Sequence, residues 1–509
     1  MKFDDILEYL GEFGAYQKRL YITVCIPSIS IAMQVLLPVF ILAIPNFRCA
    51  IPSFPNDTYI SQGKWHDDLI NKTIPTAKDG LSKCKVFGSD GSEESCDKWV
   101  YDQSIYESTL LMDIKLICGD EILRSHSNMI FFGGNLVGAF GLGLLSDLIG
   151  RKKTLMLSII LHIGTGIGIA FINEYIGFSV LRFFNGMANG GVFMTGFVIG
   201  MELVGPSKRA LAGMIIMLFW ALGLFVLGLI AYFIRDWRTL SLAVSCPSVV
   251  YLSYWWLLPE SPRWLLSKGR EKEAEDIIRK AAKVNKVELP LKLFDQHTLD
   301  TGPQSKIWHM FTDCRLLIGS LIIFFNWLVV SMVYYGLGLN VSNLSGDPYL
   351  NFTIANIAET ISYVLAILLL NRIGRKPLHC GAMLLGGVAC LATMLPVIYA
   401  NPWVTTALSM IGKLGASGAF AVIYVYAAEL FPTIVRNSGL GTSSMCARIG
   451  GMISPYIADS VIGGDLRIAL PLIIFGASSI IAGLLCLLLP ETLNRKMPET
   501  IDDAKELSR

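Results

Sequence analysis

A short polar motif occurs twice in this chain, and each copy lies between two apolar runs of membrane-spanning length. The first copy is G-L-L-S-D-L-I-G-R-K at 143–152, and the second is L-L-L-N-R-I-G-R-K at 368–376. Two further pairs of segments repeat at nearly the same offset of about 225 residues; they are Glu202-Leu203 with Glu429-Leu430, and Leu258-Pro259-Glu260 with Leu489-Pro490-Glu491. Three collinear matches predict a duplicated unit of six spans.

Composition places this duplicated unit in a membrane protein. Of the 509 residues, 53% are hydrophobic and 16% are charged, and the mean hydropathy is +0.54. A helix needs roughly 20 mainly apolar residues to cross the bilayer. Twelve such runs occur, centred near residues 32, 137, 163, 189, 222, 249, 327, 361, 388, 415, 449 and 480. The predicted fold is therefore an all-α membrane protein with twelve transmembrane helices in two six-helix halves. Two similar halves that face each other form a site that opens to either side, which is typical of a transporter.

Basic residues in the short loops predict the orientation. With the N-terminus in the cytosol, the short inner loops carry nine basic residues, and the short outer loops carry only Arg235, Arg238 and Arg467. Lys and Arg are enriched on the cytosolic side of membrane proteins, so both termini are expected in the cytosol. Residues 1–19 lack the basic start and short apolar core of a cleaved signal peptide. We therefore expect the first span to act as an uncleaved signal anchor.

These expectations divide the chain into five parts. They are a cytosolic N-terminus at 1–19, an N-terminal half at 20–258, a cytosolic linker at 259–315, a C-terminal half at 316–490 and a cytosolic tail at 491–509. The N-terminal half includes a large extracellular loop at 45–126. In the linker, the sequence at 270–283 has apolar residues on one helical face and charges elsewhere, which predicts an amphipathic helix against the inner ends of the spans.

The extracellular loop contains four cysteines and two glycosylation sequons. The cysteines are Cys49, Cys84, Cys96 and Cys118. They are expected to form two disulfides, and sequence leaves all three pairings open. Free or metal-binding thiols are the alternative, but no C-x-x-C spacing occurs in this loop. Asn56 and Asn71 begin N-D-T and N-K-T, so we expect both to be glycosylated.

Several classes of protein find no support in this sequence. It has no G-x-x-x-x-G-K-[ST] phosphate loop, no paired His and Cys ligands and no nucleophile elbow. We therefore expect neither an ATP-driven pump nor an enzyme, and no metal or cofactor. No basic tract indicates nucleic acid. Only His162 of the six histidines falls inside a span, so a proton relay through histidines is not expected.

Three ionisable residues lie well inside predicted spans: Glu359, Lys413 and Arg448. A charge there costs at least about 2.5–3.5 kcal/mol on insertion scales, so such residues persist where they face a wet cavity or each other. One interpretation is an ion pair of Glu359 with Lys413 or Arg448 that only holds the C-terminal half together. The other is that a cation binds substrate, above all Arg448, because a guanidinium fork suits a carboxylate.

Two tyrosines in the seventh span complete the candidate substrate site. Tyr334 and Tyr335 each offer a hydroxyl and a ring, and aromatic faces can hold an organic cation. Packing alone is the alternative explanation for these rings, as it is for the other aromatic residues of this span.

The repeated loops predict a gate. Asp147 ends the second span, and Arg151 and Lys152 follow one turn later. We expect these charges to bond to inner helix ends of the opposite half and to hold one conformation. Asn371 replaces the acid in the second copy, so the gate is expected to be asymmetric. The same inner network is expected to include Glu202, Arg209, Arg375, Glu429 and Arg436. Charges that only set the topology would explain the basic residues but not the acids.

Several longer motifs together point to a family. They are D-D-I-L-E-Y-L-G-E-F-G-A-Y-Q-K-R from Asp4, L-P-E-S-P-R-W-L-L from Leu258, A-E-L-F-P-T-I-V-R-N from Ala428 and L-P-E-T-L-N-R-K-M-P-E-T-I from Leu489. With the large first loop, they resemble the organic-ion transporter family of the major facilitator superfamily, over nearly the whole chain. The insect organic cation transporter-like members look most similar, and carnitine-type transporters are also similar. The resemblance implies alternating-access transport of small organic ions at the plasma membrane.

The resemblance also bears on the charge of the substrate. Vertebrate organic cation members have an aspartate where this chain has Arg448, whereas arginine is usual in anion and carnitine-type members. Lys413 resembles a lysine of those two groups, and Glu359 resembles an acid of the cation and carnitine-type members. Tyr334 and Tyr335 resemble a tyrosine pair of the anion members. This mixed set suits a zwitterion such as carnitine. Many members have six cysteines in the outer loop where this chain has four, so their disulfide pattern is not carried over.

The sequence therefore predicts a transporter of small organic cations or zwitterions, either a quaternary ammonium or a carnitine-like compound. Its partners would be this substrate and the lipid bilayer, with the coupling ion left open. An organic anion exchanger that uses Lys413 and Arg448 is the alternative among transporters. A transport-inactive receptor or adaptor that uses the outer loop is the alternative from another class.

Overall fold

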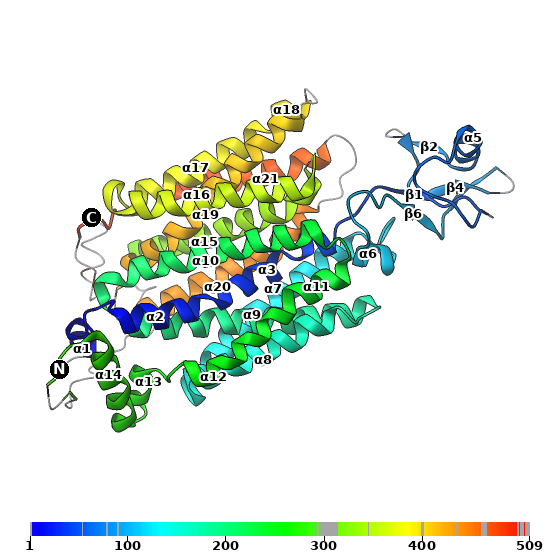
Figure 1. Cartoon of the computed structure of the whole chain (residues 1–509). Coiled ribbons are helices and arrows are strands. Elements are labelled where there is room, and N and C mark those ends of the chain that lie inside the picture. Colours follow the sequence, from blue (N-terminus) through cyan, green and yellow to red (C-terminus); the bar gives the residue numbers. More distant parts are fainter. Residues whose placement is uncertain are drawn as a thin grey trace.

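Long helices form the body of the molecule, and a small domain with short strands extends from one end of it (Figure 1). The computed structural model describes residues 3–52, 54–77, 80–88, 91–290, 293–294, 314–344, 346–398, 402–432, 435–459, 466–495, 498 and 503. Most of the predicted tail at 491–509 and the linker residues 295–313 lie outside the described residues.

The described helices form twelve spans, six in each half of the sequence. The first half has α2 (Ala15–Cys25), α3 (Pro27–Leu36) and α4 (Pro38–Ile41) as one span, then α7 (Ile122–Ile149), α8 (Arg151–Ile169), α9 (Tyr175–Leu203), α10 (Arg209–Phe233), and α11 (Trp237–Ser245) continued by η2 (Cys246–Ser253) and α12 (Tyr254–Leu257). The second half has α15 (Cys314–Asn340), α16 (Pro348–Ile373), α17 (Arg375–Ala392) with α18 (Met394–Ile398), α19 (Pro402–Leu430), α20 (Arg436–Ala458) and α21 (Leu466–Cys486). The predicted all-α fold is confirmed.

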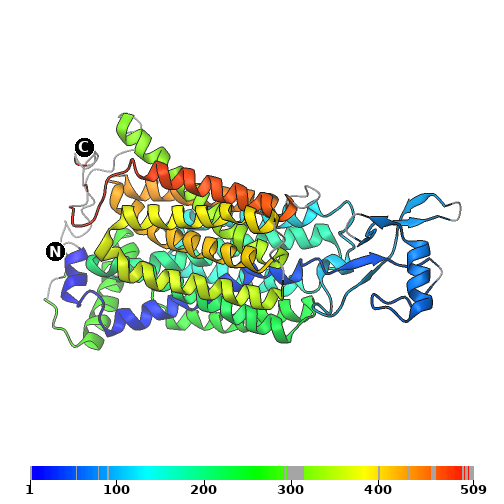
Figure 2. The ribbon, with the colours of Figure 1, turned by 90° about the horizontal axis from the view of Figure 1, so that it is seen from above.

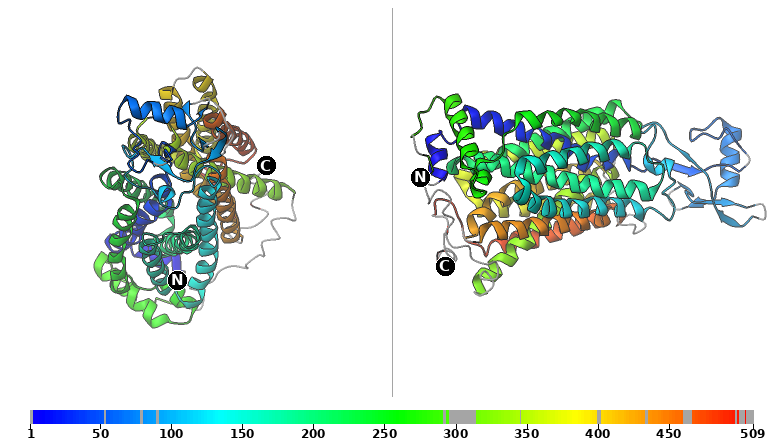
Figure 3. Two further views of the ribbon diagram at one scale, coloured as in Figure 1. Left: turned by 90° about the vertical axis from the view of Figure 1, so that its right-hand side faces the viewer. Right: turned by 90° about the horizontal axis from the view of Figure 1, so that it is seen from below.

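Nine helices of the described part are long and apolar enough to cross a membrane by themselves. The other three spans, α8, α9 and α20, reach a similar length but are not apolar enough to meet the same criterion. The first span is interrupted at Pro27 and Pro38, because proline has no N–H to continue the helical hydrogen bonds. Seen along the bundle, the helices of the two sequence halves gather on opposite sides (Figure 3).

Close helix packing repeats in the two halves. In the first half, a Cβ on Gly223 of α10 would lie 2.4 Å from the carbonyl oxygen of Ile29 in α3. In the second half, a Cβ on Gly450 of α20 would lie 2.1 Å from the carbonyl oxygen of Leu328 in α15. Only glycine allows backbones to approach so closely. The sequence repeat thus corresponds to a repeated helix contact.

The small domain lies between the first two spans, at the end of the bundle away from both termini (Figure 2); we name this the domain end and the opposite one the terminal end. Its elements are β1 (Phe47–Cys49), α5 (Lys64–Thr73), β2 (Thr76–Ala77), β3 (Gly80–Leu81), β4 (Lys85–Phe87), β5 (Glu93–Ser95), β6 (Trp99–Tyr101) and α6 (Leu110–Asp113). Antiparallel pairs join β1 to β6, β2 to β3 and β4 to β5. Disulfides link Cys49 to Cys96 and Cys84 to Cys118, which selects one of the three possible pairings.

A second small hydrophobic cluster covers the terminal end of the N-terminal half. It joins α1 (Phe3–Tyr9) to α13 (Pro262–Ser267) and α14 (Glu271–Asn285). Helix α14 covers the segment predicted to be amphipathic, and it buries Ala274, Ile278 and Ala281 against α1 and α13. The Asn285 side chain donates to the carbonyl oxygen of Leu10 at 2.8 Å. The amphipathic face therefore has the N-terminal helix as a partner, in addition to the spans.

Candidate functional site

A cavity lies between the two halves, at the middle of the bundle. It has about 720 Å³ of empty space, including the part open to solvent. Its aromatic residues are Phe132, Phe193, Trp220, Tyr334, Tyr335, Tyr363, Phe420 and Tyr424, and its polar ones include Asn135, Ser331 and Arg448. Helices α3, α7, α9 and α10 contribute from the first half, and α15, α16, α19 and α20 from the second. The position between the halves is the one that a two-sided transport site requires.

Arg448 is the charged residue of this cavity wall. Its Nη1 donates to the carbonyl oxygen of Ser444 at 2.8 Å and to the Ser444 hydroxyl, and its Nε donates to Asn135 Oδ1 at 3.0 Å. Within the described part of the chain, no carboxylate forms an ion pair with it. The cavity therefore contains a guanidinium whose positive charge has no acidic partner there.

Glu359 and Lys413 lie behind the cavity wall. Lys413 Nζ is 3.1 Å from the Glu359 carboxylate, and the exposed fractions of the two side chains are 3% and 0%. The hydroxyls of Tyr334 and Tyr363 donate to Glu359 Oε1 at 2.6 and 2.8 Å. Tyr334 thus separates the ion pair from the cavity, and its ring centroid lies 3.5 Å from Lys413 Nζ. In this conformation neither Glu359 nor Lys413 lines the cavity, and each neutralises the charge of the other. This arrangement corresponds to the interpretation as an ion pair, which the sequence left open beside substrate binding.

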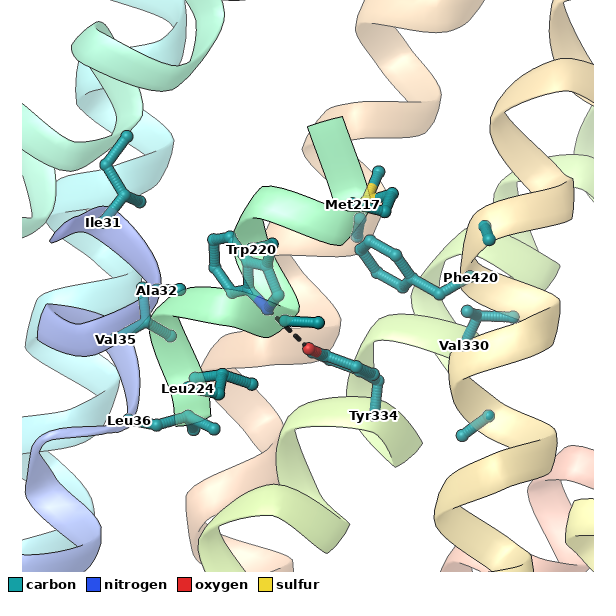
Figure 4. Close-up of a cluster of buried hydrophobic side chains, with 14 of the residues drawn as sticks. Ile31, Ala32, Val35, Leu36, Met217, Trp220, Leu224, Val330, Tyr334 and Phe420 are labelled. Atoms are coloured by element: carbon teal, nitrogen blue, oxygen red, sulfur yellow. Dashed lines mark hydrogen bonds between the residues drawn. The ribbon is translucent and has the colours of Figure 1, made fainter. Parts of the chain in front are cut away.

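A hydrogen bond joins the two halves at the cavity wall. Trp220 of α10 donates from Nε1 to the hydroxyl of Tyr334 in α15 at 2.8 Å, and Phe420 packs beside the tyrosine (Figure 4). The tyrosine hydroxyl accepts from the first half and donates to Glu359 of the second. Tyr335, the other predicted tyrosine, also lines the cavity, and its ring centroid lies 4.7 Å from that of Phe132. Trp220 and Asn135 were not predicted, because the sequence of one apolar helix does not indicate which face meets the other half.

At the terminal end, the repeated loops form one charge cluster in each half. Arg151 pairs with Asp147 at 2.6 Å and with Glu202 at 3.3 Å. Its counterpart Arg375 pairs with Glu429 at 2.9 Å. The two arginines thus take equivalent acidic partners from the loop two spans further along the chain.

The repeated L-P-E segments at 258–260 and 489–491 each contribute a glutamate to the start of the helix that follows a G-R-K loop. Gly150 and Gly374 have φ values of +111° and +107°, which favour glycine. The Glu260 carboxylate accepts from the backbone N–H groups of Arg151 and Lys152. The Glu491 carboxylate does the same for Arg375 and Lys376. An acid at a helix start satisfies free N–H groups. These capping roles of Glu260 and Glu491 were not predicted, although the repeat of L-P-E was a signal for them.

The remaining residues of the predicted gate also bind within their own half. Arg209 pairs with Asp4 at 2.8 Å, Arg436 donates to the carbonyl oxygen of Phe431 at 3.2 Å, and the Lys152 ammonium lies 5.3 Å from the ring centroid of Trp255. Among the residues that the structure describes, these loops form none of the expected bonds to the opposite half in this conformation. The physical reason is that each loop arginine has closer acids and carbonyl groups in its own repeat.

Bonds between the halves instead occur at the domain end. Arg124 of α7 lies 3.7 Å from the carboxylate of Asp459, which follows α20, and Ser125 donates to that carboxylate at 2.8 Å. Arg124 also donates to Ser342 at 3.2 Å, and the Tyr349 hydroxyl donates to the carbonyl oxygen of Ile105 at 3.1 Å. We name Arg124, Ser125 and Asp459 the domain-end bridge. It was not predicted, since its partners are over 300 positions apart in the chain.

Asn56 and Asn71 are both exposed on the small domain. No group of three His, Cys, Asp or Glu residues that could hold a metal occurs among the described residues.

Twelve spans in two similar halves, with a cavity between them, define a membrane transporter of the major facilitator type. Residues 74–502 match the family model described as Sugar (and other) transporter. The chain is 39% identical over 536 residues to the organic cation transporter protein of Drosophila melanogaster, which covers 100% of this chain and 95% of the relative. It is 34% identical over 529 residues to the human organic cation/carnitine transporter 2, covering 98% and 93%.

Among solved structures, the inward-open xylose transporter XylE from E. coli has a TM-score of 0.65 at 17% identity, covering 97% of this chain and 100% of that one, which supports the fold. The chain belongs to the sugar (and other) transporter family and, within it, to the organic cation and carnitine transporters of solute carrier family 22. It is thus a multi-pass membrane transporter and not an enzyme, as the sequence predicted.

Proposed function

We propose that this transporter carries small organic ions with a quaternary ammonium or carnitine-like structure by alternating access, and that zwitterions are its preferred substrates. The observation that carries this proposal is the cavity itself, which combines an arginine without an acidic partner and a wall of aromatic rings. A guanidinium forms strong, charge-assisted hydrogen bonds to a carboxylate. Aromatic faces attract an ammonium group through the ring quadrupole.

The charge balance near the cavity favours a zwitterion over a simple cation. Glu359 is neutralised by Lys413, so the cavity has a net positive charge from Arg448. The positive charge of an organic cation would be repelled by Arg448. A zwitterion also has a carboxylate, which would pair with the guanidinium. Two relatives with names that include organic cation or carnitine agree with this substrate class. An anion exchanger would use Lys413 with Arg448, but Lys413 is already paired in this conformation.

We also propose an orientation of the protein in the membrane and a division of the chain into cytosolic, extracellular and membrane-spanning segments. Residues 1–19, the linker at 259–315 and the tail at 491–509 would lie in the cytosol, and the loop at 45–126 outside a plasma membrane. The halves at 20–258 and 316–490 would rock against each other. The excess of Lys and Arg in the loops of the terminal end supports this orientation. So do the disulfides and exposed sequons of the opposite end, since disulfides persist in oxidising compartments.

In this scheme the two ends of the bundle form separate gates, one on each side of the membrane. The domain-end bridge would close the outer side, and the loop clusters with Asp147, Arg151 and Arg375 would govern the inner side. The inner network would also use Lys152, Glu202, Arg209, Glu429 and Arg436. Each cluster pairs internally while the outer bridge is formed, which is what a gate that opens at one end requires.

Uptake by cells that express the protein tests the proposed substrate class. The probes are labelled carnitine, tetraethylammonium and glutarate, each measured with and without sodium and proton gradients and corrected for surface expression. We expect saturable carnitine uptake and weaker tetraethylammonium uptake. Exchange driven only by glutarate would overturn the proposal in favour of an anion exchanger. An absence of all uptake at normal surface expression would indicate a receptor or adaptor.

A further inference from the structure

We propose that Asn135 of α7 and Arg448 of α20 form a two-sided carboxylate clamp, with one side from each half of the transporter. The inference rests on the proposed zwitterionic substrate and adds a residue that recognises its carboxylate. Both residues line the cavity, and Arg448 Nε donates to Asn135 Oδ1 at 3.0 Å across the boundary between the halves.

The hydrogen bonds of Arg448 leave one of its donors free for a ligand. Nη1 is occupied by Ser444 of the same helix, and Nε is occupied by Asn135. Among the described residues, no group accepts a hydrogen bond from Nη2. This nitrogen is also absent from the fully buried polar atoms that lack a partner, so it is accessible from the cavity. Nε and Nη2 form the edge of a guanidinium that donates hydrogen bonds to a carboxylate. Asn135 therefore occupies one of the two positions on the binding edge, and the second position is accessible.

The amide of Asn135 is oriented by the same bond. A guanidinium only donates hydrogen bonds, so the amide atom that faces Nε must be the oxygen. The amide Nδ2 then remains as a donor beside the arginine, and no residue of the described part accepts from it. A carboxylate that accepts from Arg448 Nη2 and from Asn135 Nδ2 would satisfy both donors at once.

A clamp of this kind couples binding to the position of the halves. A ligand shifts a conformational equilibrium only as far as its contacts differ between the two states. A carboxylate held from α7 and α20 makes both contacts only when these helices are close. The same two helices have the domain-end bridge at one end. The carboxylate of the substrate would therefore stabilise the arrangement in which this bridge is formed, and an ammonium without a carboxylate would not.

The test compares Asn135→Ala with Ser444→Ala, which removes a side-chain acceptor of Arg448 inside its own helix. In Asn135→Ala, we expect the KM for carnitine to rise about tenfold, the loss expected for one hydrogen bond to a charged group. The concentration of tetraethylammonium that halves carnitine uptake should change less than about twofold. Ser444→Ala should leave the KM for carnitine within about twofold of the wild type. Asn135→Asp, which places an acid on the guanidinium edge, should lose carnitine uptake and keep the binding of tetraethylammonium.

The outcomes separate the clamp from the proposed function. If the wild type transports carnitine and Asn135→Ala leaves its KM unchanged, the clamp is wrong and the proposed function stands. An equal rise in KM for Ser444→Ala and Asn135→Ala would show that Asn135 only positions Arg448 and does not bind the carboxylate. The clamp would again be wrong. If the wild type neither transports carnitine nor gains thermal stability from it in purified form, both proposals fail.

Discussion

Lys413 Nζ lies 3.1 Å from the carboxylate of Glu359, and both side chains are buried in the C-terminal half. The pair joins α19 to α16, and the hydroxyls of Tyr334 and Tyr363 both donate to Oε1 of the acid, while Lys413 faces Oε2. Of the two interpretations that the sequence left open for these residues, this geometry favours an ion pair that holds the half together. It leaves Arg448 as the cation that faces the cavity.

Removal of one partner of this pair should destabilise the protein far more than removal of both. Glu359→Leu or Lys413→Met alone leaves a buried charge without compensation, which costs about 3–5 kcal/mol in comparable pairs. The double variant replaces the pair by apolar groups of similar size and should restore most of the thermal stability. Melting temperatures of the purified variants measure this. Equal melting temperatures for the single variants and the wild type would show that the charges do not depend on each other.

Arg448 should determine the charge preference of the substrate. Arg448→Lys keeps the charge but loses the planar fork, so we expect carnitine uptake to weaken by about tenfold. Arg448→Asp should shift uptake from carnitine to tetraethylammonium, since the cavity then carries a negative charge. Competition assays with both probes at matched surface expression give the two profiles. Wild-type profiles in both variants would make Arg448 a structural residue.

The domain-end bridge should control access to the cavity from the side of the small domain. Arg124→Asp removes the attraction to Asp459 and adds repulsion, so we expect this end to open more often. An impermeant maleimide added outside cells should then label a cysteine introduced at Val35 in the cavity wall faster than in the same cysteine variant with Arg124 intact. Arg124→Asp with Asp459→Arg should restore slow labelling. If the labelling rate were the same in both variants and with Arg124 intact, the bridge would have no role in gating.

Asp147 should affect turnover more than affinity. Its ion pair with Arg151 is 2.6 Å long, but the Asp147 side chain is 64% exposed, and exposed pairs contribute only about 0.2–1 kcal/mol. Asp147→Ala should therefore lower the maximal uptake rate by up to about fivefold with little change in KM. Asn371→Ala, at the equivalent position of the second repeat, is the matched control and should leave the rate unchanged. A change confined to KM would contradict a gating role.

The small domain should lose stability in acid through Asp57. Burial alone would raise the pKa of this carboxyl, but hydrogen bonds from Arg48, the Ile51 N–H and His66 outweigh it and hold the pKa below its usual value. Because the folded pKa is lowered, this stabilisation is present above the ordinary carboxyl pKa of about 4 and disappears as the pH falls through the lowered pKa.

Protease resistance of the small domain on intact cells, measured between neutral and acidic pH, checks this. Asp57→Asn keeps the N-x-T sequon at Asn56 but should reduce resistance at neutral pH and flatten its pH dependence. Asp67→Asn, a change at an exposed residue of α5, should behave like the wild type. If Asp57→Asn and Asp67→Asn gave the same profile, the carboxyl of Asp57 would not be a source of acid sensitivity.

Much of the fold could be predicted from the sequence. The hydropathy runs predicted the twelve spans, and the paired motifs at 143–152 and 368–376 predicted two related halves. The family was also predicted from the motifs, and the comparisons confirm it. Membrane spans can be read in this way because the bilayer imposes on each helix a length and an apolar composition that are visible locally.

The partners of the functional residues were decided only by the tertiary structure. Arg448 meets Asn135 across 313 positions of the chain, and Ser125 meets Asp459 across 334. Lys413 meets Glu359, one of two acid–base pairings that the sequence left open. The sequence by itself predicted three charged residues of the membrane interior, Glu359, Lys413 and Arg448, but it missed Arg182, which is buried in α9. The packing of the helices decided which of them neutralise each other and which one faces the cavity, because an ion pair depends on a few ångströms in space and not on separation along the chain.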